Sequence, residues 1–239
     1  MVTSPEDPNV AQASYPQSGF PDIPGSADIL LIRHGQSEPY RPGTPFRLVD
    51  GHADPALTPN GHEQAQRLAD RLATAGIDAI YVSTLQRTAQ TAAPLADRLG
   101  ITPQVEAELR EVHLGIWEGG EYRQRVAEHD PIARQVFEQE RWDVIPGAEA
   151  SAALAGRVRG AIDRLAAGHA GHRVAIFTHG GVIGQALALA SGSRPFAFLS
   201  ADNGSISRLV VIERRWIVRG FNDTAHLNGH RRNGPPHRI

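Results

Sequence analysis

The sequence predicts a three-layer α/β/α protein in which helices cover both faces of a largely parallel central sheet. Two apolar runs, 28–35 and 173–181, are short, aliphatic and β-branched, and each ends in His-Gly. Runs of this kind are typical of buried strands. Segments with helical spacing alternate with the apolar runs, which is the pattern of parallel strands joined by crossover helices.

The first strand is expected over 29–33. An irregular stretch rich in proline and glycine follows, from Glu38 to Pro55. Its length and its place after a strand end favour a functional loop. A helix is expected from Thr58, a hydroxyl N-cap followed by Pro59, to a stop at Gly76.

The other elements follow from the same signals of apolar spacing, glycine stops and proline breaks. The last two strands are expected to form a hairpin through a tight link at Arg214-Arg215. The expected strands are 79–82, 103–105, 173–178, 206–212 and 216–221, and the expected helices are 85–99, 122–140 with a break near Asp130-Pro131, 149–167 and 180–190.

The length and composition suit one globular domain. The chain has 239 residues and a hydrophobic share of 41%, which is enough for a sizeable core. Both ends are rich in residues that break regular structure and lack apolar periodicity. We therefore expect a flexible N-terminal arm over 1–26, a folded domain over 27–227 and a flexible C-terminal tail over 228–239.

Charge and composition argue against several classes of partner. The net charge is −2, so no global basic field attracts nucleic acid or anionic lipid. Cysteine is absent, which excludes disulfides and thiolate metal sites. The N-terminus lacks the basic and apolar regions of a signal peptide, and no apolar run approaches a membrane span. A soluble cytoplasmic protein is expected, with no feature that specifies an oligomeric state.

Residues suited to phosphate chemistry follow the expected strand ends. The carboxyl ends of parallel strands form one ligand-binding edge, so His34 and His179 are expected to meet there. Neutral imidazole is a competent nucleophile at phosphorus, and the guanidinium groups of Arg33 and Arg87 match phosphate oxygens. The backbone at Gly180, which opens a helix, offers N–H groups to an anion. A carboxyl such as Glu111 can protonate a leaving alkoxide.

Five motifs in order along the chain resemble those of the histidine phosphatase superfamily, also called the phosphoglycerate mutase-like family. The resemblance covers about 28–227, nearly the whole expected domain. The motifs are Arg33-His34-Gly35-Gln36-Ser37, the helix start Pro55 to Gly61, the stretch Ser83 to Ala92 with Arg87, the segment Leu109 to Gly119 with Glu111, and His179-Gly180-Gly181.

The resemblance implies a phosphoglycerate mutase-like fold and a histidine acid phosphatase-type hydrolase of small phosphate monoesters. His34 would be the phosphorylated nucleophile, and Glu111 would protonate the leaving group and then activate water. No metal and no cofactor would be needed. The phosphoryl group would be bound by Arg33, Ser37, Arg87, His179 and Gly180.

The sequence departs from the family at one place and leaves other residues without a role. Glu38-Pro39-Tyr40 stands where relatives often carry an asparagine, while Asn203 occupies a position near the expected site. Trp117 is expected to pack under the Glu111 loop. Surface positions are expected for His52, His62, His129, His169 and His172.

Three alternatives stay open. A cofactor-dependent phosphoglycerate mutase is the nearest, although the short lid and the continuation Gly115 to Gly119 favour hydrolysis. A second is a metal site made of His34, His179 and Glu111. A third is a non-catalytic module that binds phosphorylated ligands. The segments Glu38 to Pro55 and Gly120 to Val144 are expected to cover the pocket, and neither names a substrate.

Overall fold

The computed structural model describes residues 23–227, which form a central six-stranded sheet in the order β5-β4-β6-β1-β7-β8. Strands β5, β4, β6 and β1 are parallel, β7 is antiparallel to β1, and β8 is antiparallel to β7. The strands are β1 (Ala27–Arg33), β4 (Ala79–Val82), β5 (Gln104–Val105), β6 (Arg173–Thr178), β7 (Ile206–Ile212) and β8 (Arg215–Asp223), and a separate pair consists of β2 (Leu48–Val49) and β3 (His52–Ala53).

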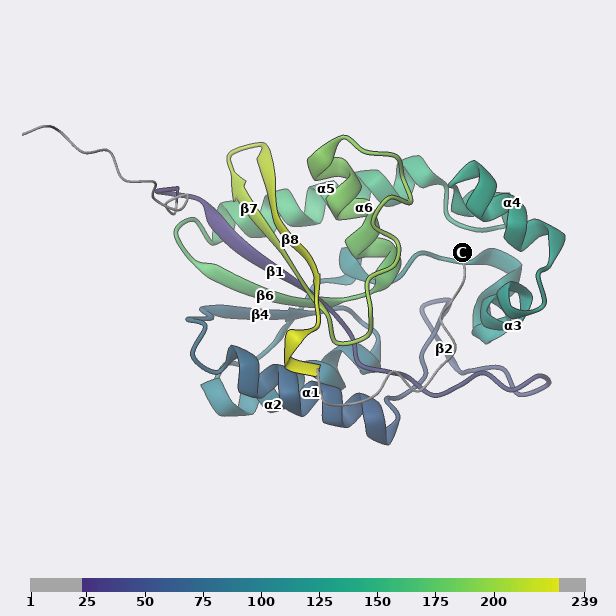
Figure 1. Cartoon of the computed structure of the whole chain (residues 1–239), viewed down its shortest axis with the longest axis horizontal. Coiled ribbons are helices and arrows are strands. Elements are labelled where there is room, and N and C mark those ends of the chain that lie inside the picture. The colour runs from purple at the N-terminus through teal and green to yellow at the C-terminus, as the bar shows by residue number, and fades with distance from the viewer. Residues whose placement is uncertain (1–22, 228–239) are drawn as a thin grey trace, which may run out of the picture.

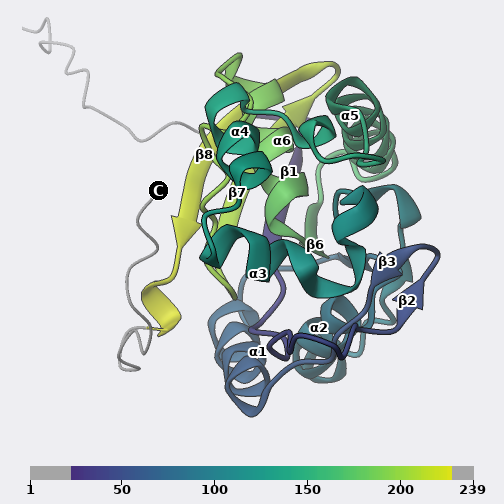
Figure 2. The same ribbon diagram turned by 90° about the vertical axis from the view of Figure 1, so that its right-hand side faces the viewer.

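Helices cover both faces of this sheet, as the sequence predicts. Helices α1 (Pro59–Leu72) and α2 (Gln86–Leu99) lie on one face, and α5 (Ser151–Gly168) and α6 (Gly180–Ser191) lie on the other (Figure 1). Helices α3 (Glu121–Ala127) and α4 (Pro131–Gln139) lie with β2 and β3 beyond one end of the sheet (Figure 2). Short 3₁₀ segments are η1 (Ala107–Leu109), η2 (Gly115–Gly120), η3 (Trp142–Val144) and η4 (Ala225–Leu227).

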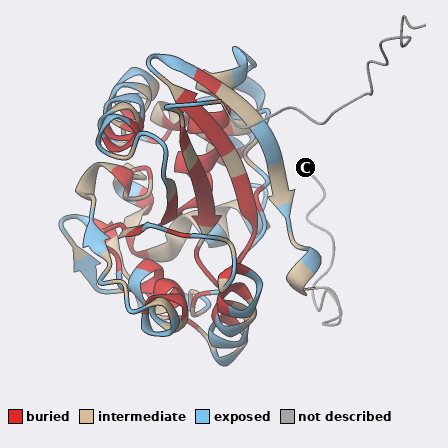
Figure 3. Ribbon diagram, turned by 90° about the vertical axis from the view of Figure 1, so that its left-hand side faces the viewer, coloured by how far each residue is buried: buried red, intermediate tan, exposed pale blue. Residues whose placement is uncertain are grey.

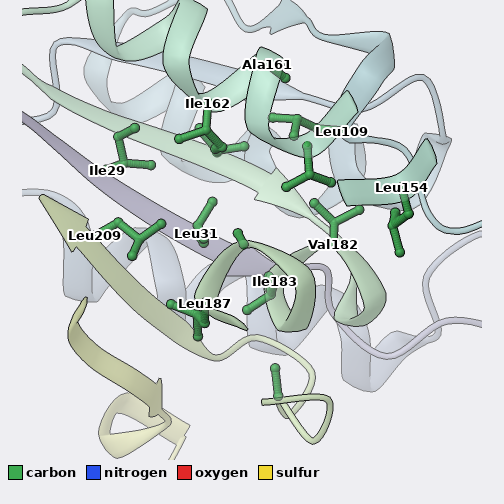
Figure 4. Packing of buried hydrophobic residues seen from close by; sticks show 14 of the residues in the cluster. Ile29, Leu31, Leu109, Leu154, Ala161, Ile162, Val182, Ile183, Leu187 and Leu209 are labelled. Atoms are coloured by element: carbon green, nitrogen blue, oxygen red, sulfur yellow. The ribbon is translucent and has the colours of Figure 1, made fainter. Parts of the chain in front are cut away.

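Strand β1 supplies side chains to two apolar cores, one on each face of the sheet. Ile29 and Leu31 join the core under α5 and α6, while Leu30 and Ile32 join the core over α1 and α2. Successive strand residues point to opposite faces, which explains the division. The inner strands β1, β4, β6 and β7 are accordingly buried along most of their length, whereas the edge strands β5 and β8 are not (Figure 3). Figure 4 shows Ile29 and Leu31 among side chains of the α5 and α6 core. The almost wholly apolar β1 and β6 follow from this two-sided burial.

Local signals in the sequence explain several element boundaries. The Thr58 hydroxyl accepts a hydrogen bond from the Gly61 amide at 3.0 Å, so the predicted N-cap of α1 is confirmed. Gly100 ends α2 with a φ of 66°. The break near Asp130 is also confirmed, because α3 ends at Ala127 and the Asp130 carboxylate caps α4 at the Ile132 amide.

Two predicted turns differ from the structure. The link between β7 and β8 is Glu213-Arg214 rather than Arg214-Arg215, and Glu213 has a φ of 52°. The stretch 38–55 is not wholly irregular, because it contains the β2–β3 hairpin. Its turn is Asp50-Gly51, with φ values of 49° and 80°. An Asp-Gly pair is a common hairpin signal, and sequence reasoning missed it here because the flanking strands are very short.

The predicted flexible ends fall mostly outside the described residues. Residues 1–22 and 228–239 are not described, so the predicted arm and tail stay predictions. The described residues begin with a turn at 23–26, where the Gly171 amide donates to the Ser26 carbonyl at 2.9 Å. Within 23–227, none of the helices combines the length and the apolar character needed to cross a bilayer.

Candidate active site

His34 and His179 lie side by side at the carboxyl edge of the parallel sheet. Strands β1 and β6 are paired in register up to Arg33 and Thr178, so the residue after each strand emerges at the same edge. The centroids of the two imidazole rings are 5.2 Å apart. The topology therefore joins two sequence motifs that are far apart along the chain.

The hydrogen bonds of His34 leave one ring nitrogen as a Lewis base. Its Nδ1 is 2.7 Å from the Gly35 carbonyl oxygen, which can only accept, so Nδ1 carries the proton. Its Nε2 accepts from the Arg87 Nε–H at 3.2 Å. The side chain is 5% exposed, and burial, followed by the charges of Arg87 and Arg33, lowers its pKa well below the usual 6.5. The ring is thus neutral, with its lone pair on Nε2.

The backbone around His34 is held rigidly. The Gly35 amide donates to Thr91 Oγ1 at 3.0 Å, and the Asn203 side-chain amide donates to the His34 carbonyl at 3.0 Å. A Cβ on Gly35 would lie 2.6 Å from the Gly61 carbonyl oxygen, so this turn requires glycine. Asn203 lies beside the site, as expected from its position before β7, and holds the main chain at His34.

Two guanidinium groups flank the imidazoles. Arg33 donates to the Ala201 carbonyl and lies against Gly180, while its Nε has no hydrogen-bond partner among residues 23–227. Arg87 donates to the Ala53 carbonyl at 2.9 Å. Burial lowers the pKa of Arg87 to about 10, so the group stays protonated at neutral pH. Both cations retain donor capacity for an anion.

His179 occupies the N-cap position of α6, and its ring faces Ser83, the residue that follows β4. Its Nε2 is 2.8 Å from Ser83 Oγ, whereas its buried Nδ1 has no partner among the described residues. Burial, followed by the charge of Arg87, lowers its pKa well below 6.5. The His179 side chain makes no capping hydrogen bond to α6, which begins at Gly180, so the ring does not occupy the backbone N–H groups at the positive end of this helix.

Glu111 is fixed at the same edge by the backbone of α6. Its Oε1 accepts from the Gly181 amide at 3.1 Å and from the Val112 amide at 3.0 Å. A Cβ on Gly181 would lie 2.6 Å from this oxygen, so glycine at this position allows the carboxylate to approach the α6 backbone. The negative charge of Glu111 raises the pKa values of Arg33 and Arg87 against the effect of burial. The carboxyl also lines the same cavity as the two guanidinium groups.

Glu118, from the same sequence motif, has a different environment. Its Oε2 accepts from the Ala53 amide at 2.9 Å, and its Oε1 accepts from the Leu114 amide at 2.8 Å. Since both oxygens bind main chain, Glu118 ties β3 to the Glu111 segment. Through Ala53, whose carbonyl holds Arg87, it supports the guanidinium next to His34.

The structure adds Arg123, which sequence reasoning missed. This α3 residue donates to Ser37 Oγ at 2.9 Å and to the Glu38 carbonyl at 2.6 Å. Its guanidinium carbon lies 5.5 Å from the Phe46 ring centroid. Its charge also contributes to the lowered pKa values of His34 and Arg87. No motif or periodicity marks this position, because only the packing of α3 over the site brings it close.

One open cavity of about 760 Å³ is lined by Arg33, His34, Ser37, Arg87, Glu111, Glu118, Arg123 and Asn203. His179 is fully buried behind these side chains, and neither His179 nor Gly180 lines the cavity. The loop 38–55 and the segment 114–127 form its walls. His52, expected at the surface, is 7% exposed and contacts the His113 ring with centroids 5.2 Å apart. That prediction was wrong because the loop folds back as a hairpin. Among residues 23–227, no group of three or more His, Asp or Glu side chains is arranged to hold a metal ion.

Comparison with known proteins agrees with this geometry. The family model of the histidine phosphatase superfamily, branch 1, matches residues 29–224.

The chain belongs to the histidine phosphatase superfamily.

A probable phosphoglycerate mutase of Yersinia enterocolitica is 31% identical over 207 residues, covering 84% of this chain and 94% of the relative. A mycobacterial glucosyl-3-phosphoglycerate phosphatase superposes with a TM-score of 0.68 at 27% identity, covering 83% of this chain and 100% of the other. A phosphoglycerate mutase of Bacillus anthracis, at 21% identity, superposes with a TM-score of 0.72 over 85% of this chain and 96% of the other, which shows the shared fold alone. Members of the superfamily act on phosphate esters, as phosphatases or as mutases.

Proposed function

We propose that this protein is a phosphomonoesterase that hydrolyses a small phosphorylated metabolite through a phosphohistidine on His34. The observation that carries the proposal is the state of His34. Its Nδ1–H is engaged by the Gly35 carbonyl, so the lone pair of Nε2 is directed away from that bond and lies beside Arg87. A neutral imidazole with one fixed tautomer among cations is prepared to attack an anionic phosphorus centre.

In the first step, the Arg87 Nε–H transfers its hydrogen bond from His34 Nε2 to a phosphoryl oxygen. The freed lone pair of Nε2 attacks phosphorus, a P–N bond forms and the ester P–O bond breaks. Arg33 and Arg87 stabilise the charge on the non-bridging oxygens, with His179, the Gly180 backbone and Ser37 as further contacts. Glu111, in its protonated form, gives a proton to the leaving alkoxide. The alcohol then departs through the open cavity.

In the second step, water attacks phosphorus and the P–N bond breaks. Glu111, now ionised, accepts the proton of the attacking water. The electron pair of the P–N bond returns to Nε2 of His34, and inorganic phosphate leaves. In both steps, Arg33 and Arg87 supply the positive charge that offsets the charge on the phosphoryl oxygens.

The cavity favours hydrolysis over transfer to a second alcohol. A mutase must retain its displaced intermediate and keep water from the phosphohistidine. Here the cavity, which the loop 38–55 and the segment 114–127 line, is open rather than enclosed. The Yersinia relative is named for mutase activity and the mycobacterial relative for phosphatase activity, so a direct comparison of both reactions is the decisive assay.

The first test is trapping of the intermediate. Brief incubation with a ³²P-labelled ester should place acid-labile, base-stable label on His34, and His34→Ala should abolish both label and turnover. A circular dichroism spectrum of His34→Ala serves as the folding control. Label on another residue, or full activity in this variant, would overturn the mechanism.

The second test separates phosphatase from mutase. The enzyme is given 3-phosphoglycerate with a trace of 2,3-bisphosphoglycerate, and 2-phosphoglycerate is followed against free phosphate. Phosphate release should exceed interconversion. Interconversion much faster than phosphate release would favour the mutase.

A further inference from the structure

The structure assigns a ring-binding subsite to the outer part of the active-site cavity, and we propose that the preferred substrates are phosphate monoesters whose alcohol carries an aromatic ring. This inference rests on the proposed phosphomonoesterase activity. The cavity, at about 760 Å³, is of the size that holds a drug-sized ligand and far exceeds a phosphoryl group. Most of its volume must therefore receive the alcohol part.

One wall of this subsite comes from the loop after His34. Tyr40 and Phe46 both line the cavity, and their rings make an edge-to-face pair with centroids 6.1 Å apart. The Phe46 amide donates to the Gly119 carbonyl at 2.9 Å. A Cβ on Gly120, whose φ is 109°, would lie 2.5 Å from the Tyr40 ring. The pair therefore packs directly against the backbone of Gly119 and Gly120.

A second aromatic wall lines the same cavity from the segment that follows Glu111. Tyr122 lies between Trp117 and Trp142, with ring centroids 6.3 Å and 5.8 Å away. Burial raises the pKa of the Tyr122 hydroxyl, so this wall is uncharged at neutral pH. Val126 extends the apolar surface along α3.

This second wall lines the same cavity as the groups proposed to act on the ester. Tyr122, Trp117 and Trp142 share this cavity with Glu111 and Arg33. An alcohol protonated by Glu111 would therefore lie in a cavity that these rings line. A polyhydroxylated alcohol would lose hydrogen bonds to water against these rings, whereas an aromatic alcohol would bury its faces and edges favourably.

The test compares two alkyl esters with similarly basic leaving groups, 2-phenylethyl phosphate and propyl phosphate. Burial of one phenyl ring predicts a kcat/KM ratio of about 10–100 in favour of the phenylethyl ester. Glycerol 3-phosphate should be no better than propyl phosphate. The ratio is independent of the folded fraction of any variant, because both esters are assayed on the same preparation.

Tyr40→Ala and Val126→Asn should each reduce this ratio several-fold. Leu48→Ala is the matched control, since Leu48 lies on the same loop, is 47% exposed and does not line the cavity. A ratio near one in the wild type, a preference for glycerol 3-phosphate, or unchanged ratios in both wall variants would overturn the inference. Failure of the proposed function looks different, because neither ester would then be hydrolysed and His34 would not be labelled.

Discussion

Replacement of Glu111 by glutamine isolates proton transfer from packing. In the structure, Glu111 uses Oε1 to accept from the Gly181 and Val112 amides. The oxygen of a glutamine amide can accept both bonds, so Glu111→Gln preserves the main-chain contacts and removes the acid. The variant should fold like the wild type and fail only in the chemical steps.

The size of the loss follows from the role of a general acid. Positioned acid–base groups contribute about 10²–10⁴-fold, which corresponds to roughly 2.7–5.4 kcal/mol of transition-state stabilisation. An alkyl phosphate expels a strongly basic alkoxide and should lose this full factor in kcat/KM. An aryl ester such as 4-nitrophenyl phosphate expels a stable anion, so its kcat/KM should fall by less than about 10-fold.

The second step adds an independent signature. In the proposed mechanism, the phosphohistidine is the same for both substrates, and Glu111 also serves as the base for its hydrolysis. With 4-nitrophenyl phosphate, Glu111→Gln should therefore form the intermediate quickly and hydrolyse it slowly. Stopped-flow measurement should show a burst of nitrophenolate close to one equivalent per active site, followed by slow turnover.

Glu118→Gln is the matched control, because Glu118 accepts from the Ala53 amide through one oxygen and from the Leu114 amide through the other. An amide cannot accept through both ends, so this variant should lose activity equally on alkyl and aryl esters and show no burst. If Glu111→Gln behaves in the same way as Glu118→Gln, Glu111 is structural and the assignment of the acid is refuted.

Three further perturbations test the site. Arg87→Lys keeps the charge but cannot donate to both His34 Nε2 and the Ala53 carbonyl, so kcat/KM should fall about 10–100-fold, and unchanged kcat and KM would place Arg87 outside the site. Gly120→Ala should destabilise the fold by roughly 1–3 kcal/mol in urea denaturation because its Cβ meets the Tyr40 ring, whereas Gly160→Ala, with open space around it, should not. Folding lowers the pKa values of His34 and His179. Below the usual pKa of 6.5, the unfolded chain therefore binds more protons than the folded chain. The free energy of unfolding should fall as the pH drops through that value, by up to about 1.4 kcal/mol per pH unit for each histidine. A urea midpoint that is flat or rises between pH 7 and pH 5 would contradict this sign.

Much of the fold could be predicted from local patterns. The apolar runs of β1 and β6 have no solvent-facing residues to interrupt them, because both faces of the central strands are buried. Thr58 marks the start of α1 and Gly100 the end of α2, because a capping hydroxyl and a left-handed glycine each act on the adjacent helix turn. The hairpin turn at Glu213-Arg214 was displaced by one residue, since arginine-rich links carry no strong turn signal.

The sequence by itself predicted the set of candidate reactive groups. These candidate groups belong to motifs that follow the ends of strands, and the carboxyl ends of parallel strands meet at one edge of the sheet. The groups are Arg33, His34, Arg87, Glu111 and His179. Their juxtaposition therefore follows from topology, which local pattern and crossover rules largely define.

Only the tertiary structure decided which groups surround those residues. Arg123 reaches Ser37 because α3 packs over the loop 38–55, and His52 is buried because that loop folds back as a hairpin. The tertiary structure also gives the two carboxylates different partners. Glu111 accepts a hydrogen bond from the α6 backbone at Gly181, whereas both oxygens of Glu118 accept from main-chain amides of Ala53 and Leu114. Such contacts join segments without regular periodicity, and they depend on how side chains fill space between elements. That information lies in the packing of the whole chain rather than in any short stretch of it.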